Sequence, residues 1–254
     1  IYFTGIMWAY SSHSGGPPAG SLQCVKKMNY ESEEMAQVFA GKDSSEDYGS
    51  GPDQFNTPSS VDTDSKGNVY VSDFWNDRVQ IFNADGKLLS TIPTTKPAKV
   101  LIHKITNEIY IFSYGLNSVP AKIQSLTKYD RRAVEKTISI FSAFPELKII
   151  LKEPFPLEKI SSGTQIALDS WTNKPAIWLA QTKVQQSEEE IATWGRSPEE
   201  KNSWLNGIIK VEKIDGKWKP TDNFGERAAK QLVRPKPPAW NIQQLYFNPK
   251  NKKL

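Results

Sequence analysis

The sequence predicts an all-β protein built from repeated four-stranded antiparallel units. Short apolar runs alternate with turn signals along most of the chain, and one order of strands and turns recurs. Helical periodicity is scarce. The 254 residues fit a single domain, and 8 Trp, 9 Tyr and 11 Phe supply bulky apolar area although the hydrophobic fraction is only 38%. We therefore expect one domain over residues 1–254 with a sizeable core.

The clearest unit spans residues 51–93. Its first two strands flank a tight turn at Gly67, a residue suited to positive φ. The third strand alternates over Arg78–Phe82, and after a turn at Gly86 the fourth covers Lys87–Ile92. Four antiparallel strands in about forty residues is the length of one β-propeller blade.

Four segments of this unit carry a resemblance to a known repeat family. They are Gly51–Pro58, Gly67–Asp73, Asn76–Phe82 and Asp85–Lys87. Together they resemble an NHL repeat over about residues 51–92. The resemblance implies an NHL-like β-propeller of four-stranded antiparallel blades.

Weaker copies of the same unit lie on both sides. The expected blades are a partial one at 1–50, then 51–93, 94–145 and 160–225, and a second partial one at 240–254. Within 94–145, the third strand is expected at Ile123–Asp130 and the fourth at Lys136–Ile140. Because NHL-like propellers usually have about six blades, we expect the ring to be incomplete in this chain, which is then a fragment or a processed product. The alternative is a closed ring of four blades, in which Lys252–Leu254 and Ile1–Gly5 together form one strand.

Segment 184–206 interrupts one of these copies. Ser187–Glu190 and Ser197–Glu200 both resemble capped helix starts with acidic first turns, which predicts a short helical insertion. Trp194 and Trp204 in this insertion either cover the rim of the propeller or form a patch that docks a partner.

Charge is unevenly placed, although the net charge is only +4. From Lys213 to Leu254 there are ten Lys or Arg residues against three acids, and Glu31–Asp53 holds seven acids against one Lys. Such runs are either solvated loops or a face that steers an acidic protein partner or RNA. Candidate partner-binding residues in the basic run are Lys230, Arg234 and Lys236.

Three residues are candidates for facing a central channel: His103, Asp62 and Asp169. Related propellers include zinc-dependent amidating lyases with several His ligands, but two His in the chain cannot build a three-His zinc site. The gluconolactonase-like propellers hold calcium with carboxylates at strand ends. The alternative use of such an Asp is to accept hydrogen bonds from backbone donors. No cofactor is predicted, and a Ca²⁺ or other metal ion in the channel stays open as an alternative.

The absence of a converging catalytic set favours a non-catalytic function. We expect an NHL-type propeller that acts as a protein-binding scaffold or as a subunit of a larger complex. The alternatives are a metal-assisted hydrolase or lyase and an RNA-binding NHL module. No membrane span is predicted, because no apolar run approaches 18 residues. The resemblance favours an exported protein, periplasmic or extracellular, with a cytoplasmic location as the alternative.

The unit at 51–93 gives the sharpest structural predictions. Its inward-facing side chains are expected to be buried between adjacent blades. They are Val61, Val69, Val71, Val79, Ile81 and Leu89. Gly67 and Gly86 are expected in turns. Asp73 is expected at a strand end, where it accepts hydrogen bonds from backbone N–H groups or from Arg78.

Overall fold

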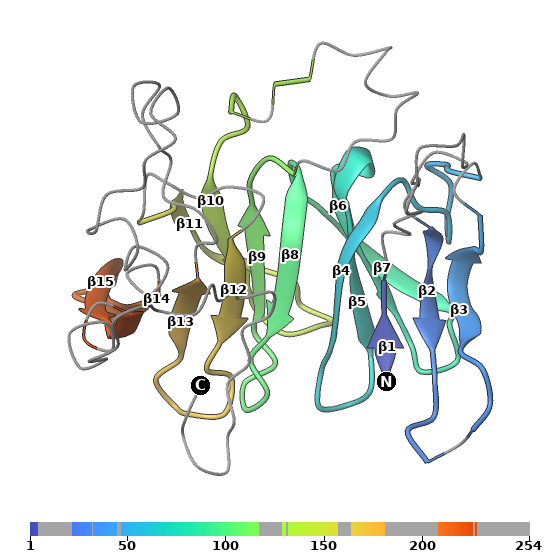
Figure 1. Cartoon of the computed structure of the whole chain (residues 1–254), viewed down its shortest axis with the longest axis horizontal. Helices are drawn as coiled ribbons and strands as arrows, with labels where there is room; N and C mark the ends of the chain where they lie inside the picture. The colour runs from blue at the N-terminus through green and yellow to red at the C-terminus, as the bar shows by residue number, and fades with distance from the viewer. Residues whose placement is uncertain are drawn as a thin grey trace, which may run out of the picture. The chain divides into compact units, whose positions relative to one another are not determined.

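A computed structural model describes residues 1–4, 22–31, 33–44, 47–116, 129–130, 132–156, 164–180, 208–225 and 227. The chain divides into two compact units, Ile1–Pro154 and Phe155–Leu254. Strands of these described residues form four antiparallel sheets of three or four strands each, three in the first unit and one in the second (Figure 1). The all-β class expected from the sequence is confirmed. No helix in these ranges is long and apolar enough to cross a membrane.

The first sheet has three strands in the order β1-β2-β3. They are β1 (Tyr2–Phe3), β2 (Gln23–Lys27) and β3 (Gln37–Lys42). The expected partial blade at 1–50 corresponds to this sheet.

The second sheet contains the unit at 51–93 and has the order β4-β5-β6-β7. Its strands are β4 (Pro58–Thr63), β5 (Val69–Asp73), β6 (Arg78–Phe82) and β7 (Leu88–Pro93), with the short helix η1 (Phe74–Asn76) between β5 and β6. Gly67 (φ +86°) and Gly86 (φ +85°) occupy the β4–β5 and β6–β7 turns, as predicted. Side chains close both turns. The Asp64 carboxylate accepts hydrogen bonds from the N–H groups of Lys66 and Asn68, and the Asn83 side chain does the same in the second turn.

The third sheet has the order β11-β10-β9-β8. Its strands are β8 (Pro97–Ile102), β9 (Ile109–Ser113), β10 (Thr137–Phe141) and β11 (Ile149–Pro154). The segment expected as the fourth strand, Lys136–Ile140, thus supplies the third strand, and the sheet continues past the boundary expected at residue 145. The expected strand order is wrong because β10 pairs with β9 directly, which makes β10 the third strand of this sheet. Residues 123–128 of the segment expected as the third strand lie outside the described residues.

The fourth sheet belongs to the second unit and has the order β12-β13-β14-β15. Its strands are β12 (Gln165–Leu168), β13 (Ala176–Ala180), β14 (Ile208–Ile214) and β15 (Lys217–Asn223). They correspond to the expected copy at 160–225. The expected helical insertion at 184–206 and the expected partial blade at 240–254 lie outside the described residues.

Apolar side chains cover both faces of the second sheet. On one face they join side chains of β8 and β9 in a buried cluster of Tyr70, Val79, Ile81, Ile92, Val100, Ile102, Ile109 and Ile111. On the other face they join side chains of the first sheet in a cluster of Val25, Ala40, Phe55, Val69, Val71 and Phe82. The first strands of the second and third sheets, β4 and β8, contact each other, and β4 also contacts β1 and β2. The NHL-like unit is therefore packed between two other sheets of the first unit.

Most of the predicted core positions are confirmed. Val69, Val71, Val79 and Ile81 are fully buried, and Val61 is half-buried against the second cluster. The prediction for Leu89 is wrong, because this side chain is 38% exposed.

A β-bulge explains the exposure of Leu89. In the pairing of β6 with β7, Phe82 lies opposite Leu88 and Ile81 lies opposite Ser90, so Leu89 has no cross-strand partner. The extra residue shifts the alternation by one, and Leu88 and Ile92 become the inward-facing side chains of β7.

This shift predicts a large difference between two alanine substitutions on the same strand. Leu89→Ala is expected to change the free energy of unfolding by less than about 0.5 kcal/mol. Ile92→Ala is expected to lower it by about 2–5 kcal/mol, because Ile92 fills the core between the second and third sheets. Urea unfolding of both variants, followed by tryptophan fluorescence, measures the difference. An equal loss in the two variants would contradict the bulge assignment.

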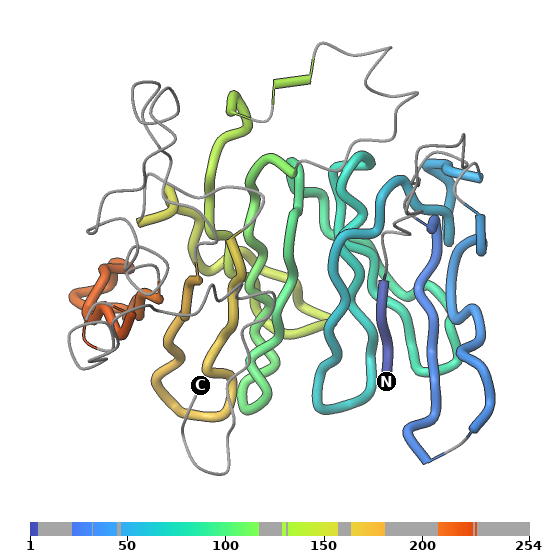
Figure 2. Tube along the Cα trace, in the orientation of Figure 1, coloured from blue at the N-terminus to red at the C-terminus, as the bar shows by residue number. Residues whose placement is uncertain are grey.

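The two ends of the first unit differ in character. The connections β2–β3, β4–β5 and β8–β9 lie at one end, which we call the hairpin end (Figure 2). Helix η1 lies at the opposite end. Three large apolar side chains in the connections of the hairpin end are strongly exposed: Tyr30 (83%), Met35 (89%) and Ile105 (51%).

Candidate functional site

Asp62, expected to face a channel, forms hydrogen bonds with β8, the edge strand of the neighbouring third sheet, and with Lys104. Its Oδ2 accepts a hydrogen bond from the backbone N–H of Ile102 at 2.7 Å, and its Oδ1 pairs with the Lys104 ammonium at 2.6 Å. Two residues earlier on both strands, Ser60 makes a similar contact with Val100. The Ser60 hydroxyl accepts a hydrogen bond from the Val100 N–H and donates one to the Val100 C=O, each at 3.3 Å. Side chains of β4 thus satisfy backbone groups that β8, an edge strand, cannot pair within its own sheet.

Charge near Asp62 is dominated by lysines. Lys104 also donates to the backbone C=O of Thr63. Burial lowers the pKa of Lys99 on β8, while the nearby Asp62 carboxylate works in the opposite direction. The Asp62 carboxylate is therefore engaged with a backbone N–H group and a lysine ammonium group.

His103 is buried in the turn between β8 and β9. Its Nδ1 lies 2.7 Å from the Thr106 hydroxyl, and its backbone C=O accepts a hydrogen bond from the N–H of Asn107 at 2.7 Å. These contacts shape the turn locally.

Asp169 follows β12 in the second unit, where its backbone N–H donates to the C=O of Ala176 at 2.7 Å. Its Oδ1 is buried and has no hydrogen-bond partner among the described residues. No group of three or more His, Cys, Asp or Glu side chains that could hold a metal ion occurs in the part of the chain that the structure describes. The candidate partner-binding residues Trp194, Trp204, Lys230, Arg234 and Lys236 all lie outside that part.

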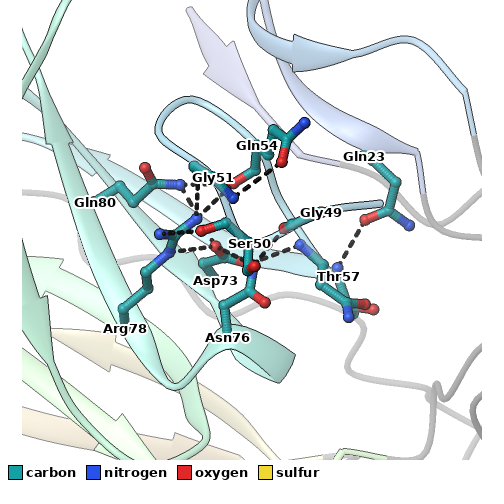
Figure 3. Close-up of polar contacts among 11 residues, drawn as sticks. Gln23, Gly49, Ser50, Gly51, Gln54, Thr57, Asp73, Asn76, Arg78 and Gln80 are labelled. Carbon is teal, nitrogen blue, oxygen red and sulfur yellow. Dashed lines mark hydrogen bonds and ion pairs between the residues drawn. The ribbon is translucent and has the colours of Figure 1, made fainter. Parts of the chain in front are cut away.

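A buried polar network of the described residues surrounds Asp73, at the end of β5 (Figure 3). The side chain is fully buried, and its carboxylate accepts hydrogen bonds from the Asn56 N–H at 2.7 Å, the Asn76 side chain at 2.8 Å and the Arg78 guanidinium at 2.8 Å. The prediction that Asp73 ends a strand and accepts from backbone N–H groups or Arg78 is confirmed. Burial raises the pKa of Asp73, and the donated hydrogen bonds with the charge of Arg78 oppose that rise.

Arg78 connects this carboxylate to the segment that leads into β4. Its remaining N–H groups donate to the backbone C=O groups of Ser50, Gly51 and Gln54 at 2.8–2.9 Å (Figure 3). The buried Gln80 amide donates to the same Gln54 carbonyl. One ion pair thereby fixes a loop that has no regular secondary structure.

The network also holds Thr57 in an unfavourable backbone conformation. Thr57 has φ +63°, a value that β-branched residues rarely adopt. Its N–H donates to the Gln23 side chain on β2 at 2.8 Å, and its C=O accepts from the N–H of Phe74. Hydrogen bonds to two neighbouring elements stabilise the strained residue and so fix the course of the chain into β4.

Comparison with protein families identifies the segment that carries this network. A model described as the NHL repeat matches residues 55–82. This segment is an NHL repeat. It contains both members of the Asp73–Arg78 ion pair and the first three strands of the second sheet.

Solved structures are similar to this chain only at low identity. A protein of unknown function from Bacteroides caccae has 12% identity, with 63% of this chain and 48% of that chain covered and a TM-score of 0.36. Hydrazine synthase from Kuenenia stuttgartiensis has 11% identity, with 66% and 55% covered and a TM-score of 0.29. The chain thus spans about half the length of each of these proteins. A search of curated proteins found no match.

Sequence reasoning missed two glutamines that support the NHL repeat. Gln23 and Gln80 are fully buried polar side chains on β2 and β6. A signal was present for Gln80, which occupies an inward-facing position between Arg78 and Phe82 in the alternating strand. A polar residue at such a position requires a buried hydrogen-bond partner.

Proposed function

We propose that this chain is part of an NHL-type β-propeller that binds protein partners, as a scaffold or as a subunit of a larger complex. The NHL repeat lies in a four-stranded antiparallel sheet that is covered on both faces by neighbouring sheets, and this packing carries the proposal. Consecutive antiparallel sheets stacked face to face, with their first strands adjacent, are the arrangement of propeller blades.

The hairpin end supports protein binding. Tyr30, Met35 and Ile105 project from connections at this end, and most of the surface of each side chain is exposed. Exposed large apolar side chains are candidate anchors for a partner, and Tyr and Met are enriched in protein interfaces. The rigid sheets below would present these connections with little loss of entropy on binding.

Native mass spectrometry of the full-length tagged protein, purified from its source cells, tests the proposal. We expect a complex of fixed stoichiometry. The variant Tyr30→Ser/Met35→Ser/Ile105→Ser is expected to bind its partner at least about tenfold more weakly, because each lost anchor costs about 1 kcal/mol or more. The matched control is Ile149→Ser/Ile150→Ser, which removes two exposed apolar side chains from β11 and should keep the partner. A mass equal to the protein alone, or equal binding by both variants, would contradict the proposal.

A further inference from the structure

The β2–β3 connection is an acidic and apolar surface, which we call the acidic loop. It consists of Tyr30, Glu31, Glu33, Glu34 and Met35, and all five side chains are exposed. Tyr30 and Met35 have the two highest exposed fractions among the large apolar side chains of the described residues. No basic residue lies between Tyr30 and Met35, so the negative charge of the loop is not neutralised within it.

The β14–β15 turn region carries the opposite charge, and we call it the basic hairpin. It consists of the exposed residues Lys213, Ile214, Lys217 and Lys219. Ile214 pairs across the hairpin with Lys217 and is 41% exposed. Lys219 lies 3.9 Å from the Asp215 carboxylate, whereas Lys213 and Lys217 form no ion pair within the described ranges.

We propose that the acidic loop of one copy of this chain binds the basic hairpin of a second copy. This inference rests on the proposed protein-binding role and names one partner for the hairpin end. Opposite charges would steer the two surfaces together, since neither Glu31 and Glu33 of the loop nor Lys213 and Lys217 of the hairpin form an ion pair among the described residues. Tyr30 and Met35 can then cover Ile214 and the aliphatic stems of the lysines.

Both surfaces belong to oppositely charged runs of the sequence. The loop lies in the acidic run of the sequence, Glu31–Asp53, and the hairpin opens the basic run, Lys213–Leu254. Because every copy carries both surfaces, two copies can form a closed two-fold dimer with two equal contacts, or many copies can form an open chain. Both forms raise the mass of the purified protein in solution.

Sedimentation velocity of the full purified chain tests the inference. We expect association that grows with protein concentration at about 50 mM salt and weakens about tenfold or more at about 500 mM salt, where screening is stronger. We expect self-association to weaken at least about tenfold in each of two variants, Glu31→Lys/Glu33→Lys and Lys213→Glu/Lys217→Glu.

An equimolar mixture of these two variants is the decisive sample. The reversed loop of one variant faces the reversed hairpin of the other, so the mixture is expected to regain the association of the unmodified chain. The control Lys148→Glu/Lys152→Glu changes two exposed lysines of the first unit, with the same change in net charge as the hairpin variant, and should associate normally.

Two results would overturn the inference: a monomer at all salt concentrations, or a mixture that does not regain association. A monomeric chain that still forms a fixed complex with other proteins in its source cells would overturn only this inference. Self-association by the control and both variants alike would show that other surfaces are responsible, and would also reject it.

Discussion

Replacing Asp73 by Asn is expected to lower the free energy of unfolding by about 3 kcal/mol, because removing one partner of a buried ion pair leaves the other charge uncompensated. Asp73 is fully buried and Arg78 nearly so. The three backbone carbonyls that Arg78 also contacts keep the loss at the lower end of the usual range for such pairs. Urea unfolding with linear extrapolation measures the loss.

The matched control for this variant is Asp77→Asn, four residues away. Asp77 pairs with Lys96 at 2.7 Å, but its side chain is 49% exposed. The loss is therefore expected to stay within about 1 kcal/mol, as for other surface ion pairs. Hydrogen exchange adds a local readout, since Asn56 N–H donates to the Asp73 carboxylate and should lose protection only in the Asp73 variant. Equal destabilisation by the two variants would mean that the buried network does not hold the loop.

Gly41→Ala is expected to have a comparable or larger effect, a loss of about 2–5 kcal/mol, because two costs add. Gly41 has φ +84°, a region that costs an L-residue about 1–2 kcal/mol. A Cβ at this position would also collide with the Gln23 carbonyl oxygen and lie 2.6 Å from a ring carbon of Phe55. Overpacking of this kind typically costs about 1–3 kcal/mol.

Gly67→Ala separates the two costs. Gly67 has nearly the same backbone angle, φ +86°, but a Cβ there would have no neighbour within 4 Å. The Gly67→Ala variant is therefore expected to lose only the backbone cost, about 1–2 kcal/mol of unfolding free energy. Thermal and urea unfolding of the two variants under identical conditions give the difference. An equal loss of unfolding free energy in the two variants would contradict the close packing of Gly41 against Phe55.

The local pattern of the sequence predicted the NHL repeat in detail. Alternation placed Val69, Val71, Val79 and Ile81 in the core, because the side chains of a strand point to opposite faces with a period of two. The same pattern failed at Leu89, since a bulge adds one residue to β7 and reverses the phase. It also failed to place the strands after residue 113, where the repeat is weak and the third and fourth strands were expected too early.

The polar network around Asp73 was predicted only in part, because most of its partners are far away in the sequence or are backbone groups. The sequence pointed to Asp73 and Arg78, which are close together in the chain and sit at adjacent strand ends. It could not show that Arg78 would donate to the carbonyls of residues 50, 51 and 54, because backbone carbonyls carry no residue-specific signal. It also could not show that Asp62 would contact the backbone of β8 and Lys104, which lie forty or more residues away in the chain.

The sequence by itself determined the all-β class, the NHL repeat with its turns at Gly67 and Gly86, and the pairing of Asp73 with Arg78. These features depend on local order: alternation, turn residues and charges a few positions apart. Only the tertiary structure decided the phase of β7, the edge contacts of Ser60 and Asp62, and the support of Thr57 by Gln23. Those features arise where separate sheets meet, and the packing there decides which partners come within reach of a buried polar group.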